Sequence, residues 1–225
     1  MLKVQPYAGY PLEEGRYVRG NDFSPAAVVI ILNSDEDKIP PAIEALVRAG
    51  AEGGAALSGT LQTPNIGIEK VICNIVANPN IRYLILGGPE SEGHRTGDAL
   101  KALILNGVDD KRSIINTEAL FPSLFNISLD AIERFRKQIT LVDLQFKAEP
   151  DIIRNAVKAA YQEKSTEFNG CLMHDQGAYP EPPIGEKITW RVTQPWIGLL
   201  DEKEKKAVRR AQELMDKIRK KYEKK

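Results

Sequence analysis

The sequence predicts an α/β fold, Rossmann-like and doubly wound, with a mainly parallel sheet. Two apolar runs, at residues 26–32 and 83–86, are unbroken and rich in branched side chains, which is typical of strands covered on both faces. Helical patterns follow both runs, and such alternation of strand and helix produces a parallel sheet. We expect this domain to span residues 1–160, with a turn-rich C-terminal extension and terminal helix packed on it at residues 161–225.

The further elements follow from local patterns. Residues 1–25 are rich in glycine, proline and tyrosine and predict an extended arm. Apolar residues at helical spacing predict helices at residues 42–49, 65–78, 98–106, 128–143 and 150–163. Besides the strand at residues 26–32, strands are expected within residues 51–60, at residues 81–86 and at residues 113–116.

Helix ends are marked by particular residue types. Pro40 and Pro41 suit the first turn of the first helix, and Gly50 suits its end. Ser128 is expected to be an N-cap, and Gly107 a C-cap, of their respective helices.

The C-terminal extension differs in character from the domain. Residues 169–183 are turn-rich, residues 187–192 alternate as a strand does, and residues 203–222 predict a helix with one apolar stripe. We expect the stripe to pack on the domain and the basic face opposite to be solvated. Binding of this basic face to an acidic partner or a membrane surface is the alternative.

Composition excludes several classes of protein. The 225 residues include 31 basic and 31 acidic ones, so nothing indicates nucleic acid as a partner. The two cysteines are far apart, which favours a reducing compartment over a disulfide framework. No signal peptide is visible, and the longest apolar run has seven residues, whereas a membrane helix needs about 20. We therefore expect a soluble, cytoplasmic protein that does not span a membrane.

The candidate site is the loop between the strand at residues 81–86 and the next helix. It carries His94, one of only two histidines, and it follows a strand end, where open α/β folds bind ligands. An imidazole there can act as an acid-base group or a metal ligand. No second histidine or cysteine lies nearby, which weakens a zinc site but leaves room for a metal whose other positions a cofactor fills. The structural alternative is that His94 caps the following helix.

Glycines surround this histidine and let the backbone approach a bulky or charged ligand closely. The candidate glycines are Gly87, Gly88, Gly93 and Gly97. Their spacing matches neither a dinucleotide-binding fingerprint nor a P-loop. Thr96 and Asp98 have a structural alternative too, as caps of the helix.

A second, weaker candidate site lies in the extension. Cys171, His174 and Asp175 fall within five residues and could form part of a metal or catalytic site. The structural alternative is a turn capped by the aspartate. The loop could also cover a cofactor or contact a partner.

The residues around His94 also resemble a known family. The run GTLQTPNIGIEKVICNIVANPNIRYLILGGPESEGHRTGDALKALILNGVDD, and AIERFRKQITLVDL after it, are similar to the A subunit of tetrahydromethanopterin S-methyltransferase. The resemblance runs from about residue 22 to about residue 143 and is densest over residues 65–109. In this archaeal membrane complex, the A subunit carries a cobamide, and the histidine of a GHxTG loop is implicated as a ligand to cobalt.

The resemblance implies a methyl carrier with His94 as the axial ligand of cobalt. The four glycines would then admit the corrin ring, and Thr60, Asn65 and Thr96 could donate to its amide side chains. A carboxylate from Glu90, Glu92 or Asp98 could hold the other imidazole nitrogen. The implied partners are methyltransferase subunits or enzymes that deliver and remove the methyl group.

The sequence also departs from the family. We expect no membrane anchor of the kind that usually ends the A subunit, Arg95 stands where an apolar residue is expected, and residues 87–89 differ from the usual pattern. We therefore expect a soluble paralogue. Two alternatives stay open: a non-catalytic interaction module that has lost the cobamide, and a cobalt-independent enzyme acting on a pterin or folate through His94 and the His174 loop.

Overall fold

The computed structural model describes residues 3–33 and 39–161. Five strands form one sheet in the order β1-β3-β2-β4-β5. Only β1 is antiparallel, to β3, and the other neighbours are parallel. The strands are β1 Tyr17–Arg19, β2 Ala26–Ile31, β3 Leu57–Leu61, β4 Tyr83–Gly87 and β5 Thr140–Asp143. The predicted Rossmann-like α/β class, with its mainly parallel sheet, is therefore confirmed.

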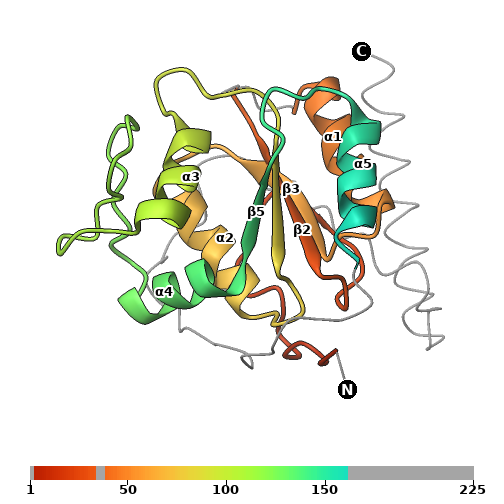
Figure 1. Ribbon diagram of the computed structural model, residues 1–225, viewed down its shortest axis with the longest axis horizontal. Helices are drawn as coiled ribbons and strands as arrows, with labels where there is room; N and C mark the ends of the chain where they lie inside the picture. Colours follow the sequence, from red (N-terminus) through yellow and green to blue (C-terminus); the bar gives the residue numbers. More distant parts are fainter. Residues whose placement is uncertain (1–2, 34–38, 162–225) are drawn as a thin grey trace, which may run out of the picture. The chain divides into compact units, whose positions relative to one another are not determined.

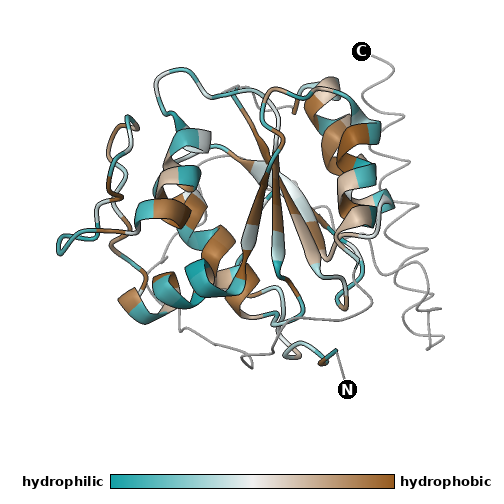
Figure 2. Ribbon diagram, in the orientation of Figure 1, coloured by the Kyte–Doolittle hydropathy of each residue, from teal (hydrophilic) through white to brown (hydrophobic). Residues whose placement is uncertain are grey.

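Helices cover both faces of this sheet, as Figure 1 shows. The helices are α1 Pro41–Glu52, α2 Ile66–Val76, α3 Thr96–Asn106, α4 Leu129–Gln138 and α5 Pro150–Ala159. Alternate residues of β2 separate two cores. Val28 and Ile30 pack with α1 and α5, whereas Val29 and Ile31 pack with α2, α3 and α4. Figure 2 shows hydrophobic stretches along the strands and on parts of the helices, which alternate there with hydrophilic ones. No helix in the described ranges is both long and apolar enough to cross a membrane.

Several expected boundaries are wrong. The helix expected at residues 128–143 is α4 followed by β5, because residues after Gln138 turn extended and pair with β4. Of residues 113–116, only Ser113 and Ile114 form bridges, which are isolated, and the segment is no strand of the sheet. The arm contains an unforeseen strand, β1, whose partner β3 lies about forty residues away.

Gly50 does not end the first helix, which continues to Glu52 and is capped by Gly53. Its role is packing, because a Cβ at Gly50 would lie 2.4 Å from the Ser58 hydroxyl oxygen. The predicted caps at Ser128 and Gly107 are confirmed. The extension and its predicted strand and helix lie outside the described residues.

The strand order reverses between β2 and β4, the two neighbouring strands from which the chain moves to opposite sides of the sheet. From β2 the chain moves to β3 on one side, and from β4 it moves to β5 on the other. The helices that follow β2 and β4, α1 and α3, lie on opposite faces. Ligands of doubly wound folds bind outside the carboxyl ends of such a strand pair. The loop that carries His94 leaves the sheet at this point.

Candidate functional site

The loop between β4 and α3 begins with a forced turn at Gly88. Its φ angle is +87°, and a Cβ there would lie 3.0 Å from the carbonyl oxygen of Ile31 in β2. Both the backbone conformation and the close approach to β2 therefore favour glycine. The turn directs the chain away from the sheet at the boundary between β2 and β4.

Glu90 braces the base of this loop against α3. One carboxylate oxygen accepts hydrogen bonds from the backbone N–H of Ser91 at 2.8 Å and of Gly97 at 2.9 Å. The other accepts from the N–H of Asp98 at 2.9 Å and from the side-chain amide of Gln145 at 3.0 Å. A carboxylate at a helix N-terminus satisfies free amides and complements the helix dipole. Glu90 is thus one of the residues that cap α3.

Ser91 and Thr96 form a second, buried brace. The Ser91 hydroxyl accepts from the backbone N–H of Thr96 at 3.1 Å and donates to its hydroxyl at 3.0 Å. The Thr96 hydroxyl donates in turn to the carbonyl of Gln62, after β3, at 2.9 Å. The caps of α3 are therefore Glu90 and Ser91, and the assignment of this role to Thr96 or Asp98 is wrong.

The tip of the loop contrasts with its base. Glu92, Gly93 and His94 are exposed, and a Cβ at Gly93 would meet no atom within 4 Å. His94 makes no hydrogen bond or ion pair with any described residue. It does not cap α3, which removes the structural alternative for this side chain. Arg95, in the left-handed region at φ 50°, pairs with the exposed Glu118.

None of the three candidate carboxylates holds the imidazole. Glu90 is engaged in capping, and Asp98 accepts from the Thr117 hydroxyl at 2.6 Å and from the backbone N–H of Glu118 at 2.9 Å. Glu92 lies exposed beside His94 in the sequence. The histidine is therefore presented by a braced loop without a partner of its own among residues 3–33 and 39–161.

Two of the candidate glycines serve internal packing. A Cβ at Gly87 would lie 2.9 Å from methyl carbons of Ile30 and Ile153. A Cβ at Gly97 would lie 2.3 Å from the side-chain nitrogen of Gln145. Because added atoms would displace these neighbours, both positions favour glycine regardless of a ligand.

Thr60 and Asn65 belong to the same edge of the sheet as His94. Thr60 is near the carboxyl end of β3 and is half-buried. Asn65 is the N-cap of α2, and its side-chain oxygen accepts from the N–H of Ile66 at 2.8 Å. The fold thus brings both residues to the edge where the His94 loop begins.

Sequence reasoning missed the end of β5 as part of this edge. Gln145 bonds to Glu90, and its oxygen accepts from Lys101 of α3 at 2.8 Å. Lys101 also pairs with Asp143 at 3.5 Å. Phe146 donates its backbone N–H to the carbonyl of Gly88 at 2.8 Å. No local signal could have revealed these contacts, because this segment follows the α4–β5 boundary, which local patterns misplace.

The described residues of this loop offer one exposed imidazole, that of His94, as a candidate metal ligand. Among residues 3–33 and 39–161, no three His, Cys, Asp or Glu side chains gather as metal ligands. One exposed imidazole without a partner supplies a single ligand, which is sufficient when a macrocycle fills the other positions. The open space beside Gly93 fits the approach of a bulky group. Cys171, His174 and Asp175 lie outside the described residues.

Comparison with known proteins identifies the family. The family described as the A subunit of tetrahydromethanopterin S-methyltransferase matches residues 3–184. The second A subunit of this methyltransferase from Methanothermobacter thermautotrophicus is 39% identical over 196 residues, which cover 87% of this chain and 92% of that protein. The first A subunit of the same organism is 38% identical over 187 residues, covering 83% and 69%. The A subunit from Methanopyrus kandleri is 41% identical over 183 residues, covering 81% and 67%. The chain therefore belongs to the family of tetrahydromethanopterin S-methyltransferase A subunits.

Proposed function

We propose that this protein is a cobamide-binding methyl carrier in which His94 is the axial protein ligand of cobalt. The observation that carries the proposal is the state of His94: exposed, unpaired among the described residues, and held on a braced loop at the switch point of the sheet. The relatives are named as subunits of a methyltransferase that uses tetrahydromethanopterin. We propose that this protein is cytoplasmic and that its partners are methyltransferase subunits or enzymes that deliver and remove the methyl group.

Different residues would have different tasks. His94 would bind the metal, and Gly88 and Gly93 would keep the backbone clear of the ring. Thr60 and Asn65, on the same edge, are the candidates to bind the amide side chains of the cofactor. Glu90 with Gly97, and Thr96 with Ser91, would keep the loop in place, since each of these two pairs is already hydrogen-bonded.

When bound, the cobamide supplies a cobalt centre that can accept a methyl group and pass it on. The contribution of the protein is to present one imidazole nitrogen from a braced loop. Because the base of the loop is fixed by hydrogen bonds, little ordering is needed when the cofactor binds.

The proposal is tested by reconstitution with cob(II)alamin and electron paramagnetic resonance. With histidine labelled by nitrogen-15, the splitting from the axial nitrogen should change in the wild-type protein, which identifies a histidine as the ligand. His94→Ala should abolish this change. His174→Ala is the matched control, because His174 is the only other histidine of the chain. If the nitrogen-15 label still changes the splitting in His94→Ala, His94 is not the cobalt ligand and the proposal is refuted.

Loss of folding cannot mimic this result. His94 is exposed and has no hydrogen bond or ion pair with a described residue, so His94→Ala should change the free energy of unfolding by less than about 0.5 kcal/mol. Wild-type protein that binds no cobalamin would favour the interaction module. Methyl transfer by cobamide-free protein would favour the pterin or folate enzyme.

A further inference from the structure

Phe146, in the turn after β5, combines two unfavourable features. Its φ angle is +68°, in the left-handed region, where a bulky side chain is strained. The residue is also 70% exposed, so its ring gains little from burial. Another residue type, such as glycine or asparagine, would meet the demands of this turn better. Phe146 therefore calls for an explanation outside the stability of the fold.

The position of Phe146 is fixed against the His94 loop. Beyond the end of β5 the parallel pairing continues: Leu144 donates to the carbonyl of Leu86 at 2.8 Å, and Phe146 donates to the carbonyl of Gly88 at 2.8 Å. Gly88 is the turn from which the loop departs. The exposed ring thus belongs to a backbone segment that is hydrogen-bonded to the start of the candidate site.

The neighbouring residue shows that this segment has two roles. Gln145 is buried and bonds to Glu90, one of the residues that cap α3. Its backbone N–H is held by the side chain of Asp143 at 3.0 Å. Gln145 is thus directed into the brace below the loop, whereas Phe146, one residue later, is exposed at the carboxyl edge of the sheet. A rigid aromatic in such a place can bury apolar surface on binding with little loss of conformational freedom.

We infer that Phe146 is a contact residue for the cofactor, an apolar surface against which the corrin macrocycle packs when His94 binds its metal. This inference rests on the proposed function. It adds the end of β5 to a site otherwise built from the loop after β4. The expected contact is hydrophobic, so it should affect affinity and leave the identity of the axial ligand unchanged.

The chain offers a matched control for this inference. Phe121 is also left-handed, at φ 52°, and 83% exposed, but it lies between α3 and α4 and not in a turn at the carboxyl edge of the sheet. Replacing either phenylalanine by glycine removes the same backbone strain and the same ring. Neither Phe146→Gly nor Phe121→Gly should therefore lower the melting temperature by more than a few degrees.

The test is the affinity of each protein for cob(II)alamin, measured by calorimetry. Phe146→Gly should weaken binding by about tenfold, the loss expected for much of an aromatic side chain no longer buried. Phe121→Gly should leave binding unchanged, and Phe146→Leu should restore part of it. The nitrogen splitting from His94 should persist in all three variants.

Each outcome has a separate meaning. If the wild-type protein binds cobalamin and Phe146→Gly binds it equally well, the contact is refuted while the proposed function stands. If both glycine variants weaken binding equally, the effect is not specific to the site and the inference fails. If the wild-type protein binds no cobalamin, the proposed function fails and this inference with it.

Discussion

The two edges of the sheet use polar residues in opposite ways. At the amino edge, where β2 and β4 begin, Asp22, Asn78 and Asn80 are at most 2% exposed and bond mainly to one another and to nearby backbone. At the carboxyl edge, the polar residues at the base of the loop are bonded, but His94 at its tip is exposed and has no described partner. The first edge is closed by hydrogen bonds, and the second leaves one imidazole exposed.

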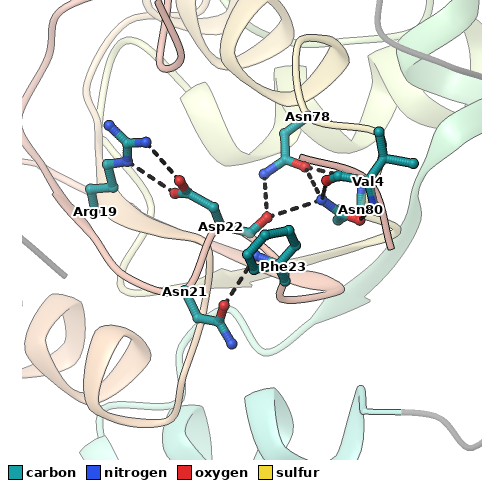
Figure 3. Close-up of polar contacts among 7 residues, drawn as sticks. All are labelled: Val4, Arg19, Asn21, Asp22, Phe23, Asn78 and Asn80. Atoms are coloured by element: carbon teal, nitrogen blue, oxygen red, sulfur yellow. Dashed lines mark hydrogen bonds and ion pairs between the residues drawn. The ribbon is translucent and has the colours of Figure 1, made fainter. Parts of the chain in front are cut away.

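Figure 3 shows how the amino edge is closed. The side-chain amides of Asn78 and Asn80 donate to the carbonyl of Asp22 at 2.9 and 3.1 Å, and Asn80 also donates to the carbonyl of Val4 at 2.6 Å. The Asp22 carboxylate accepts two bonds from Arg19, at 2.9 and 2.6 Å. Buried polar groups are tolerated only when they are bonded in this way. The network ties the N-terminal arm to the turns before β2 and β4.

The largest expected effect is at the amino edge. The side-chain amide of Gln138, which is 9% exposed, donates to the carbonyls of Ile75, Asn78 and Ile81, each at 3.0 Å. Gln138→Leu leaves these acceptors without that donor and should lower the free energy of unfolding by about 2–3 kcal/mol, measured in urea. The neighbouring residue Lys137 is exposed and provides the control. Lys137→Leu should change the free energy of unfolding by less than about 0.5 kcal/mol.

A smaller effect on stability is expected at the carboxyl edge, together with an effect on binding. Glu90→Ala removes one of the caps of α3 and should lower the free energy of unfolding by about 1–2 kcal/mol. Hydrogen exchange at the amides of Gly97 and Asp98, which donate to Glu90, should become faster, and cobalamin binding should weaken. Glu92→Ala, in the same loop, should change none of these. Equal effects from both variants would contradict the distinction between base and tip.

The smallest expected effect on the free energy of unfolding comes from Glu13, in the N-terminal arm, and it depends on pH. Burial raises the pKa of Glu13 above its ordinary value of 4.5, and Lys70 opposes this rise. The folded state therefore holds a proton that the unfolded state releases, so stability falls as the pH rises from 4.5 through the raised pKa. Glu13→Gln should slightly stabilise the protein above this window.

The control is to compare the free energies of unfolding of Glu13→Gln and the wild-type protein again at acid pH. Below the ordinary pKa of glutamate both states of the wild-type protein are protonated, so the advantage of the glutamine should disappear. The backbone contacts of Glu13 with Asn74, at 2.8 and 2.9 Å, do not involve its carboxylate and should persist. An advantage that is independent of pH would show that the charge is not its cause.

Some errors of the sequence-based prediction share one physical cause. The pattern at residues 128–143 is helical throughout and contains no glycine or proline where α4 gives way to β5. That boundary depends on pairing with β4, which lies far away in the sequence. The sequence makes Glu90 a candidate partner of the imidazole, but its separation from Gly97 and Asp98 by seven and eight residues does not follow the local capping box. Tertiary contacts override local preference in both places.

By itself, the sequence determined the α/β class, the strands around β2 and β4, and the family, because periodicity acts locally and the motifs are contiguous. Only the tertiary structure decided that His94 stays exposed while Glu90, Ser91 and Gln145 brace the loop beneath it. It also decided that Phe146 lies beside Gly88. These are contacts between strand ends that meet when the sheet forms, and no local pattern encodes them.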